Sequence, residues 1–346
     1  MLKYPFALLC LLLILGTACQ RNSDTFFLKS EGAVMPVRIA GKARSHQYLV
    51  ILPGGPAGDG QLYRRVFPMF RKQLEPKLKV VYYDQRGSGA SGGTIEPASL
   101  SLAQLSQDLD RIIEVIKEED KRAEIYLLGY SFGGSLGMHY LLDPVHQAKV
   151  EGFIGLCGAY NRKLQAKYQQ QLIGGLLDHW VEQGEITNYR TLLTEYRCAD
   201  QVNPERCERD SLLRLSDLLI RIEDLERYNH FPLSGKNIGN LLSGVFYSPS
   251  NPITSGINES HNGIYFQSEF DSLLLGDQVS VIETPSLLMA GRYDTNVPYF
   301  DAQEIINLLG TEKDNKQLLI LEKSGHLPMF TEPDLIAAEI LKFVDH

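Results

Sequence analysis

The most constraining feature of this sequence is an apolar run that ends in a Gly-x-Ser-x-Gly motif. Residues 125–137 read Ile-Tyr-Leu-Leu-Gly-Tyr-Ser-Phe-Gly-Gly-Ser-Leu-Gly. The run predicts a buried strand, and the residues after the serine predict a helix. Such a turn exposes Ser131 at a sharp corner, where Gly129 and Gly133 leave room because neither carries a Cβ. A serine hydroxyl is a weak nucleophile unless a base activates it. We therefore expect Ser131 to be a nucleophile with partners elsewhere in the chain.

Two later apolar runs each lead into a residue that could serve as such a partner. Residues 285–290 are followed by Gly-Arg-Tyr and Asp294, and residues 317–321 are followed within five residues by His326. In open α/β sheets, functional residues gather at the carboxyl ends of the strands. A turn-capping aspartate and an ordinary surface histidine are the structural alternatives for each residue taken singly. Because the chain order is that of α/β-hydrolase sheets, we predict a catalytic triad of Ser131, Asp294 and His326.

The negative charge of the transition state needs hydrogen-bond donors. One donor is expected from the N–H of Phe132, at the start of a predicted helix whose dipole favours an anion. The second is expected from the Gly-rich loop 53–58, Pro-Gly-Gly-Pro-Ala-Gly, which follows a predicted strand. We predict Gly55 as that donor, with Gly54 as the alternative. A phosphate-binding loop is excluded because no Gly-Lys-Ser/Thr follows.

These segments together resemble the proline iminopeptidases and the related tripeptidyl aminopeptidases, which are serine peptidases on the α/β-hydrolase fold. The resemblance covers roughly residues 45–160 and 280–346 and includes an Asp-Gln-Arg-Gly-Ser-Gly-Ala-Ser segment at 84–91. This segment is the most family-specific, and we expect it to form tight turns and a charged pair that buttresses the nucleophile corner. Pro53 stands where the smaller members have His, and the loop ends Pro-Ala-Gly instead of Pro-Gly. Both departures leave the substrate range open.

The resemblance implies that the protein releases residues from free peptide N-termini through an acyl-enzyme. It also implies carboxylates that hold the substrate's α-ammonium group. Glu223 lies in an Arg-Ile-Glu segment similar to one in the smaller members, and Glu269 ends a segment, 263–269, similar to one in larger members. We predict one of these two glutamates as the anchor. The alternative is that both belong to solvated helix faces.

The pattern of predicted elements indicates the α/β class. Strands alternate in the first half with helices expected near 61–75, 101–118 and 132–143, which favours an α/β-hydrolase fold with a mostly parallel central sheet and flanking helices. From about residue 161 the chain is helix-like with little strand signal. We therefore predict a core made of 31–160 and 275–346, and a helical cap insertion at 161–274 that would cover the site.

The N-terminus reads as a targeting segment. Residues 1–18 have an early lysine, an apolar stretch and small residues before Cys19, as in a signal peptide. Residues 15–19, Leu-Gly-Thr-Ala-Cys, resemble a bacterial lipobox, which implies cleavage before Cys19 and lipid attachment to it. Ordinary secretory cleavage in the same patch is the alternative. We expect an exported envelope protein, periplasmic or on the cell surface, with residues 19–30 as a tether.

Other features exclude several classes of function. The net charge is −8 without basic runs, which argues against nucleic acid. Neither Cys-x-x-Cys nor His-Glu-x-x-His spacing occurs, so we expect no metal and no cofactor. Cys198 and Cys207 could form a disulfide in an oxidising envelope or remain two thiols.

We therefore predict a serine hydrolase that acts as a proline iminopeptidase-like aminopeptidase on peptides. An esterase or lactonase with the same triad is the first rival, and a non-catalytic binding lipoprotein is the second.

Overall fold

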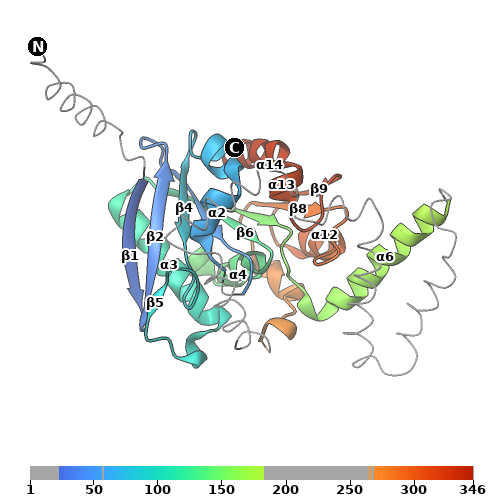
Figure 1. Ribbon diagram of the computed structural model, residues 1–346, viewed down its shortest axis with the longest axis horizontal. Coiled ribbons are helices and arrows are strands. Elements are labelled where there is room, and N and C mark those ends of the chain that lie inside the picture. The colour runs from blue at the N-terminus through green and yellow to red at the C-terminus, as the bar shows by residue number, and fades with distance from the viewer. Residues whose placement is uncertain (1–22, 57, 183–264, 266–268, 346) are drawn as a thin grey trace, which may run out of the picture.

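The computed structural model describes residues 23–56, 58–182, 265 and 269–345 (Figure 1). The signal segment, Cys19, Glu223 and the cysteines at 198 and 207 lie outside the described residues, so the predictions made for them stay predictions.

One nine-stranded sheet forms the centre of the structure, in the order β1-β2-β4-β3-β6-β7-β8-β9, with the short β5 paired to β2. The strands are β1 Ser23–Ser30, β2 Ala33–Gly41, β3 Gln47–Leu52, β4 Lys79–Tyr83, β5 Gly92–Gly93, β6 Glu124–Tyr130, β7 Gly152–Leu156, β8 Ser286–Gly291 and β9 Lys316–Leu321. Strands β4, β3, β6, β7, β8 and β9 are parallel neighbours. The β1–β2, β2–β4 and β2–β5 pairs are antiparallel. The predicted α/β class with a mostly parallel sheet is confirmed.

Helices cover both faces of this sheet (Figure 1). The α-helices are α2 Gly60–Val66, α3 Leu102–Glu119, α4 Phe132–Leu141, α5 Pro144–Gln147, α6 Gln165–Glu182, α12 Tyr299–Leu308, α13 Pro328–Thr331 and α14 Pro333–Val344. Shorter turns are the π-helical η1 Phe70–Leu74 and the 3₁₀ segments η2 Pro97–Ser99, η3 Arg162–Leu164, η5 Gly276–Val281 and η6 Lys313–Asn315. Helices α3, α4 and α12 pack on one face, and α2, η1, α13 and α14 pack on the other.

The apolar runs of the sequence explain this two-sided packing. In β3, Val50 and Leu52 belong to the core cluster of α3 and α4, whereas Leu49 and Ile51 belong to the cluster of α2 and α14. A strand covered on both faces needs apolar residues at successive positions, because successive side chains point to opposite faces. This is why the central strands read as continuous apolar runs.

Two segments differ from the sequence-based expectation. The single helix expected near 61–75 is divided into α2 and η1, because Pro68 cannot continue the helix and the residue before a proline favours an extended backbone. Phe67 accordingly has φ −110° and ψ 92°. Residues 23–30, within the expected tether, form β1 and pair antiparallel with β2. Leu28 faces the core, so the sheet includes part of the segment predicted as a tether.

The predicted cap insertion leaves and re-enters the core through a hydrogen-bonded stem. The Leu275 N–H donates to the Tyr160 carbonyl at 3.3 Å, and the Lys163 N–H donates to Leu273 at 3.1 Å. The Asn161 side-chain oxygen accepts the Gly276 N–H at 3.0 Å. Helix α6 extends away from the core after this stem (Figure 1). None of the described helices combines the length and apolar character that a bilayer span requires.

Candidate active site

Ser131 lies at the corner between β6 and α4 in a strained backbone conformation. Its φ is 52° and its ψ is −118°, values that non-glycine residues rarely adopt. The flanking positions must be glycine, because a Cβ at either one would clash with backbone atoms. A Cβ at Gly129 would lie 2.4 Å from the Gly133 carbonyl oxygen, and a Cβ at Gly133 would lie 2.0 Å from the Leu52 oxygen. The corner therefore has the geometry predicted from the motif.

The structure brings together the three residues of the predicted triad, which lie far apart in the sequence. His326 Nε2 is 3.1 Å from Ser131 Oγ, and His326 Nδ1 is 2.8 Å from Asp294 Oδ2. Asp294 follows β8 and His326 follows β9, so both side chains project from the same sheet edge as Ser131. This is the arrangement of a nucleophile, a base and an orienting carboxylate.

Asp294 is held by its surroundings as well as by the histidine. Its carboxylate is fully buried, and its Oδ1 accepts N–H groups from Asn296 at 2.9 Å and Val297 at 2.8 Å. Hydrogen bonds to a buried carboxylate stabilise its charged form. The other oxygen of this carboxylate, Oδ2, is therefore held in a fixed position toward His326.

His326 is fixed from the side of the nucleophile strand. The Tyr130 hydroxyl donates to the His326 carbonyl at 2.7 Å, and the two rings lie 5.3 Å apart. The residue before the nucleophile thus helps to place the base.

Cys157 lies beside the triad and was not predicted. It follows β7 with φ 48°, and its Sγ lies 3.8 Å from the Gly325 carbonyl oxygen. Burial raises the pKa of its thiol well above the ordinary value, and the Asp294 carboxylate raises it further. Among the described residues, Cys157, Asp294 and His326 are the one group whose donor atoms, within 4.8 Å of one another, could hold a metal ion. The histidine and the carboxylate already bond each other, so we assign this group to the triad. The sequence could have indicated a position near the site, because Cys157 directly follows the apolar run of β7 and functional residues gather at the carboxyl ends of strands.

The Gly-rich loop after β3 lies against the nucleophile. A Cβ at Gly54 would lie 3.3 Å from the Ser131 Cβ, and the Gly54 N–H donates to the Tyr63 hydroxyl at 2.8 Å. Gly55 has φ +138°, which L-residues rarely adopt. Because the Gly54 N–H is already bonded, the loop favours Gly55 over Gly54 as the oxyanion donor. Phe132 is the first residue of α4, next to Ser131.

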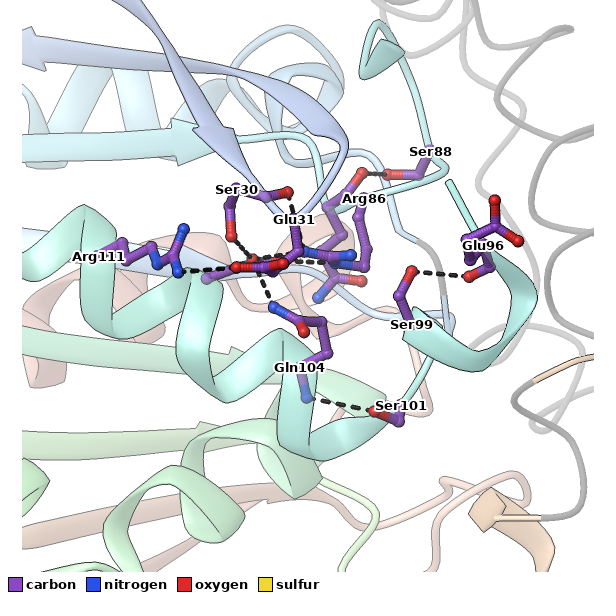
Figure 2. Close-up of polar contacts among 11 residues, drawn as sticks. Ser30, Glu31, Arg86, Ser88, Glu96, Ser99, Ser101, Gln104 and Arg111 are labelled. Carbon is purple, nitrogen blue, oxygen red and sulfur yellow. Dashed lines mark hydrogen bonds and ion pairs between the residues drawn. The ribbon is translucent and has the colours of Figure 1, made fainter. Parts of the chain in front are cut away.

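The segment 84–91 braces the Gly-rich loop, whereas its sequence predicted a support for the nucleophile corner. Gln85 Oε1 accepts the Gly58 N–H at 3.1 Å, and Ser88 Oγ donates to the Gly58 carbonyl at 2.8 Å. The expected charged pair joins Arg86 to Asp108 of α3, at 2.6 and 2.7 Å (Figure 2). Arg86 belongs to the predicted segment, whereas its partner Asp108 and the loop that the segment supports were not predicted from the sequence.

Of the two glutamates predicted as ammonium anchors, Glu269 is described. Its Oε2 accepts the N–H of Leu102, the first residue of α3, at 3.1 Å. The next residue, Phe270, packs edge-on against Phe132 with ring centroids 5.3 Å apart. The structure thus places Glu269 on the stem, one residue from a contact with the nucleophile corner. Among the described residues, no hydrogen bond or ion pair joins the Glu269 carboxylate to Ser131, Asp294 or His326.

Comparison with known proteins agrees with this geometry. A proline iminopeptidase of Saccharolobus solfataricus is 26% identical over 302 residues, which cover 87% of this chain and 86% of the relative. A proline iminopeptidase of Thermoplasma volcanium is 22% identical over 320 residues, covering 92% and 96%. The crystal structure of a proline iminopeptidase from Mycobacterium smegmatis superposes with a TM-score of 0.64 at 13% identity, covering 93% of this chain and 98% of that one.

The family described as alpha/beta hydrolase fold matches residues 47–333. This span holds the nucleophile corner, the Gly-rich loop and the strands that carry Asp294 and His326. The chain therefore belongs to the alpha/beta hydrolase fold family.

Proposed function

We propose that this hydrolase is a serine aminopeptidase of the proline iminopeptidase type. The carrying observation is that one imidazole, His326, lies within hydrogen-bond distance of both Ser131 Oγ and Asp294 Oδ2. The relatives named proline iminopeptidase that match most of the chain support the peptidase reading.

In this proposal the triad works through an acyl-enzyme. Ser131 Oγ attacks the carbonyl carbon of the scissile bond while His326 Nε2 takes the hydroxyl proton. His326 then gives that proton to the departing amine, and Asp294 stabilises the imidazolium. A water molecule, deprotonated by His326, attacks the acyl carbon; the bond from that carbon to Ser131 Oγ breaks, His326 returns the proton to Oγ, and the carboxylic acid product leaves.

The tetrahedral oxyanion is held by the N–H groups of Phe132 and Gly55. Phe132 opens α4, so its amide lies at the positive end of the helix dipole. Gly55 belongs to the loop whose neighbour Gly54 lies against Ser131. Loss of one such donor costs about 10²–10³ in kcat.

Recognition of the free amine is assigned to Glu269 or Glu223. Glu269→Gln is a sharp test, because the glutamine oxygen can still accept the Leu102 N–H while the negative charge is lost. The variant is expected to raise KM for substrates with a free amine and to leave N-acetylated substrates unaffected. If Glu269→Gln and Glu223→Gln both retain the wild-type preference for free amines, the anchor assignment is wrong.

The function is tested with a panel of aminoacyl-naphthylamides, proline and alanine included, with free and acetylated amines beside short acyl esters. An aminopeptidase hydrolyses the free-amine amides, and Ser131→Ala abolishes this. Hydrolysis of esters alone would identify an esterase. A wild-type chain that a fluorophosphonate probe fails to label would be a non-catalytic binding protein.

We further propose that the protein is exported to the bacterial envelope and anchored by lipid at Cys19. The support is the sequence of residues 1–19, with its early lysine, apolar stretch and lipobox-like end. Metabolic lipid labelling that is undiminished in Cys19→Ser would contradict the anchor.

A further inference from the structure

The segment 84–91 is not used by the chemistry proposed above, yet it contacts the loop that carries the oxyanion donor. Gln85 is fully buried two residues after the end of β4, and its Oε1 accepts the Gly58 N–H at 3.1 Å. Ser88 Oγ donates to the Gly58 carbonyl and to the Gln85 carbonyl, each at 2.8 Å. Both polar groups of the Gly58 backbone are therefore held by one segment.

Gly58 in turn determines where the rest of the loop can lie. A Cβ on Gly58 would lie only 1.8 Å from the Gly54 carbonyl oxygen, so the two ends of the loop are packed against each other. Gly54 contacts Ser131 and carries the chain into Gly55. A shift of Gly58 would consequently move the Gly55 amide relative to the nucleophile.

The segment that holds Gly58 is itself anchored to the core. Arg86 and Asp108 form a two-bond ion pair with side chains 0% and 1% exposed. Ser30 Oγ donates to Asp108 Oδ1 at 2.5 Å, and Gln104 Nε2 donates to the same oxygen at 3.3 Å (Figure 2). The pair ties residue 86 to both α3 and β1, which gives Gln85 a rigid base.

We propose that Gln85 is a positioning residue for the oxyanion site. Its carboxamide oxygen fixes Gly58, and through Gly58 and Gly54 it sets the position of the Gly55 N–H. Preorganised donors stabilise an oxyanion because they need no rearrangement as the charge develops. A neutral acceptor suits this fully buried place, since an unpaired carboxylate there would carry a large desolvation cost. The inference rests on the oxyanion role proposed for Gly55.

The test is Gln85→Met, which keeps the length of the side chain and removes the acceptor. We expect kcat/KM to fall about 10–100-fold, mostly through kcat, because a donor displaced by about 1 Å costs on the order of 10²-fold. The inhibition constant of an aminoacyl boronate, which forms a tetrahedral adduct with the serine, should rise by the same factor. The inhibition constant of the amino acid product should stay unchanged.

The matched control is Gln104→Met, which removes a carboxamide that donates to Asp108 of the ion pair and not to Gly58. It should keep the wild-type kcat/KM. Fluorophosphonate titration gives the concentration of folded sites in each preparation, so that misfolding is not counted as lost catalysis. Should Gln85→Met fail to fold, Ser88→Ala decides, since it removes the hydroxyl that links the Gly58 carbonyl to the Gln85 carbonyl and so loosens the contact between Gln85 and Gly58.

An unchanged kcat/KM in the deciding variant overturns the proposal. The proposal is also overturned if kcat/KM falls equally in Gln104→Met. It is overturned as well if the inhibition constant of the product rises as much as that of the boronate. The substrate, the boronate and the product are those of whichever substrate class the wild-type chain hydrolyses, for an ester substrate an alkyl boronate and the carboxylic acid product. An esterase result would therefore overturn the aminopeptidase assignment and leave the test of Gln85 intact.

Discussion

The buried carboxyl of Asp301 predicts an unusual dependence of stability on pH. Asp301 lies in the first turn of α12 and is 4% exposed. Its Oδ2 accepts the N–H groups of Tyr160 at 2.8 Å and Asn161 at 3.1 Å, where the stem begins. Burial raises the pKa of this carboxyl to about 7, although the two N–H groups favour the charged form, and the charge of Glu304 raises it further.

The sign follows from proton linkage. The pKa in the folded state lies above the value of about 3.9 in an unfolded chain, so folding favours the protonated form. The associated stability is fully present below about pH 4 and is lost as the pH rises through about 7. At 1.36 kcal/mol per pKa unit, a difference of about 3 units corresponds to about 4 kcal/mol, of which about 2.6 kcal/mol is lost between pH 5 and pH 8.

The substitution Asp301→Asn removes the titration and keeps an oxygen that can accept both N–H groups. We expect the free energy of unfolding of Asp301→Asn, relative to wild type, to rise by about 2.6 kcal/mol from pH 5 to pH 8. Urea unfolding at both pH values and constant ionic strength measures this difference. Using the change with pH cancels any fixed effect of replacing oxygen by an amide.

The control is Asp277→Asn, which removes an exposed carboxylate next to the stem. Its difference from wild type should be the same at both pH values. A difference between Asp301→Asn and wild type that is also constant from pH 5 to pH 8 would refute the argument, because it would mean that the buried carboxyl does not change its charge in this range.

Three further substitutions test the site and its support. Gly133→Ala should abolish activity and destabilise the fold, because its Cβ would lie 2.0 Å from the Leu52 oxygen. The control Gly174→Ala, whose Cβ would have no atom within 4 Å, should keep the wild-type activity and melting temperature. Equal activity and melting temperature in the two variants would contradict the steric argument. Asp294→Asn should lower kcat by about 10³–10⁴-fold with circular dichroism unchanged, and wild-type kinetics would remove Asp294 from the triad. Arg86→Met leaves a buried carboxylate without its cation and should lower the free energy of unfolding by about 3–5 kcal/mol in urea titrations, so an unaltered midpoint would show that the pair contributes little.

The sequence by itself determined the elements that depend on neighbouring residues. The corner at Ser131 follows from glycines two positions to either side, and the central strands follow from unbroken apolar runs. Asp294 and His326 could be assigned because each follows such a run, and parallel strands bring their carboxyl ends to one edge. The edge strand β1 was missed, since its sequence, Ser-Asp-Thr-Phe-Phe-Leu-Lys-Ser, lacks the polar–apolar alternation of a strand and directly follows a polar stretch that reads as a tether.

Only the tertiary structure decided which segments brace one another. Gln85 and Gly58 are 27 positions apart, and nothing local to either indicates that the carboxamide of one would hold the amide of the other. Cys157 comes to lie beside the triad, and Asp301 comes to hold the stem, through the order and register of strands and helices distant in the chain. Local sequence sets backbone conformation and burial, whereas the partner of a buried polar group depends on how complete elements pack together.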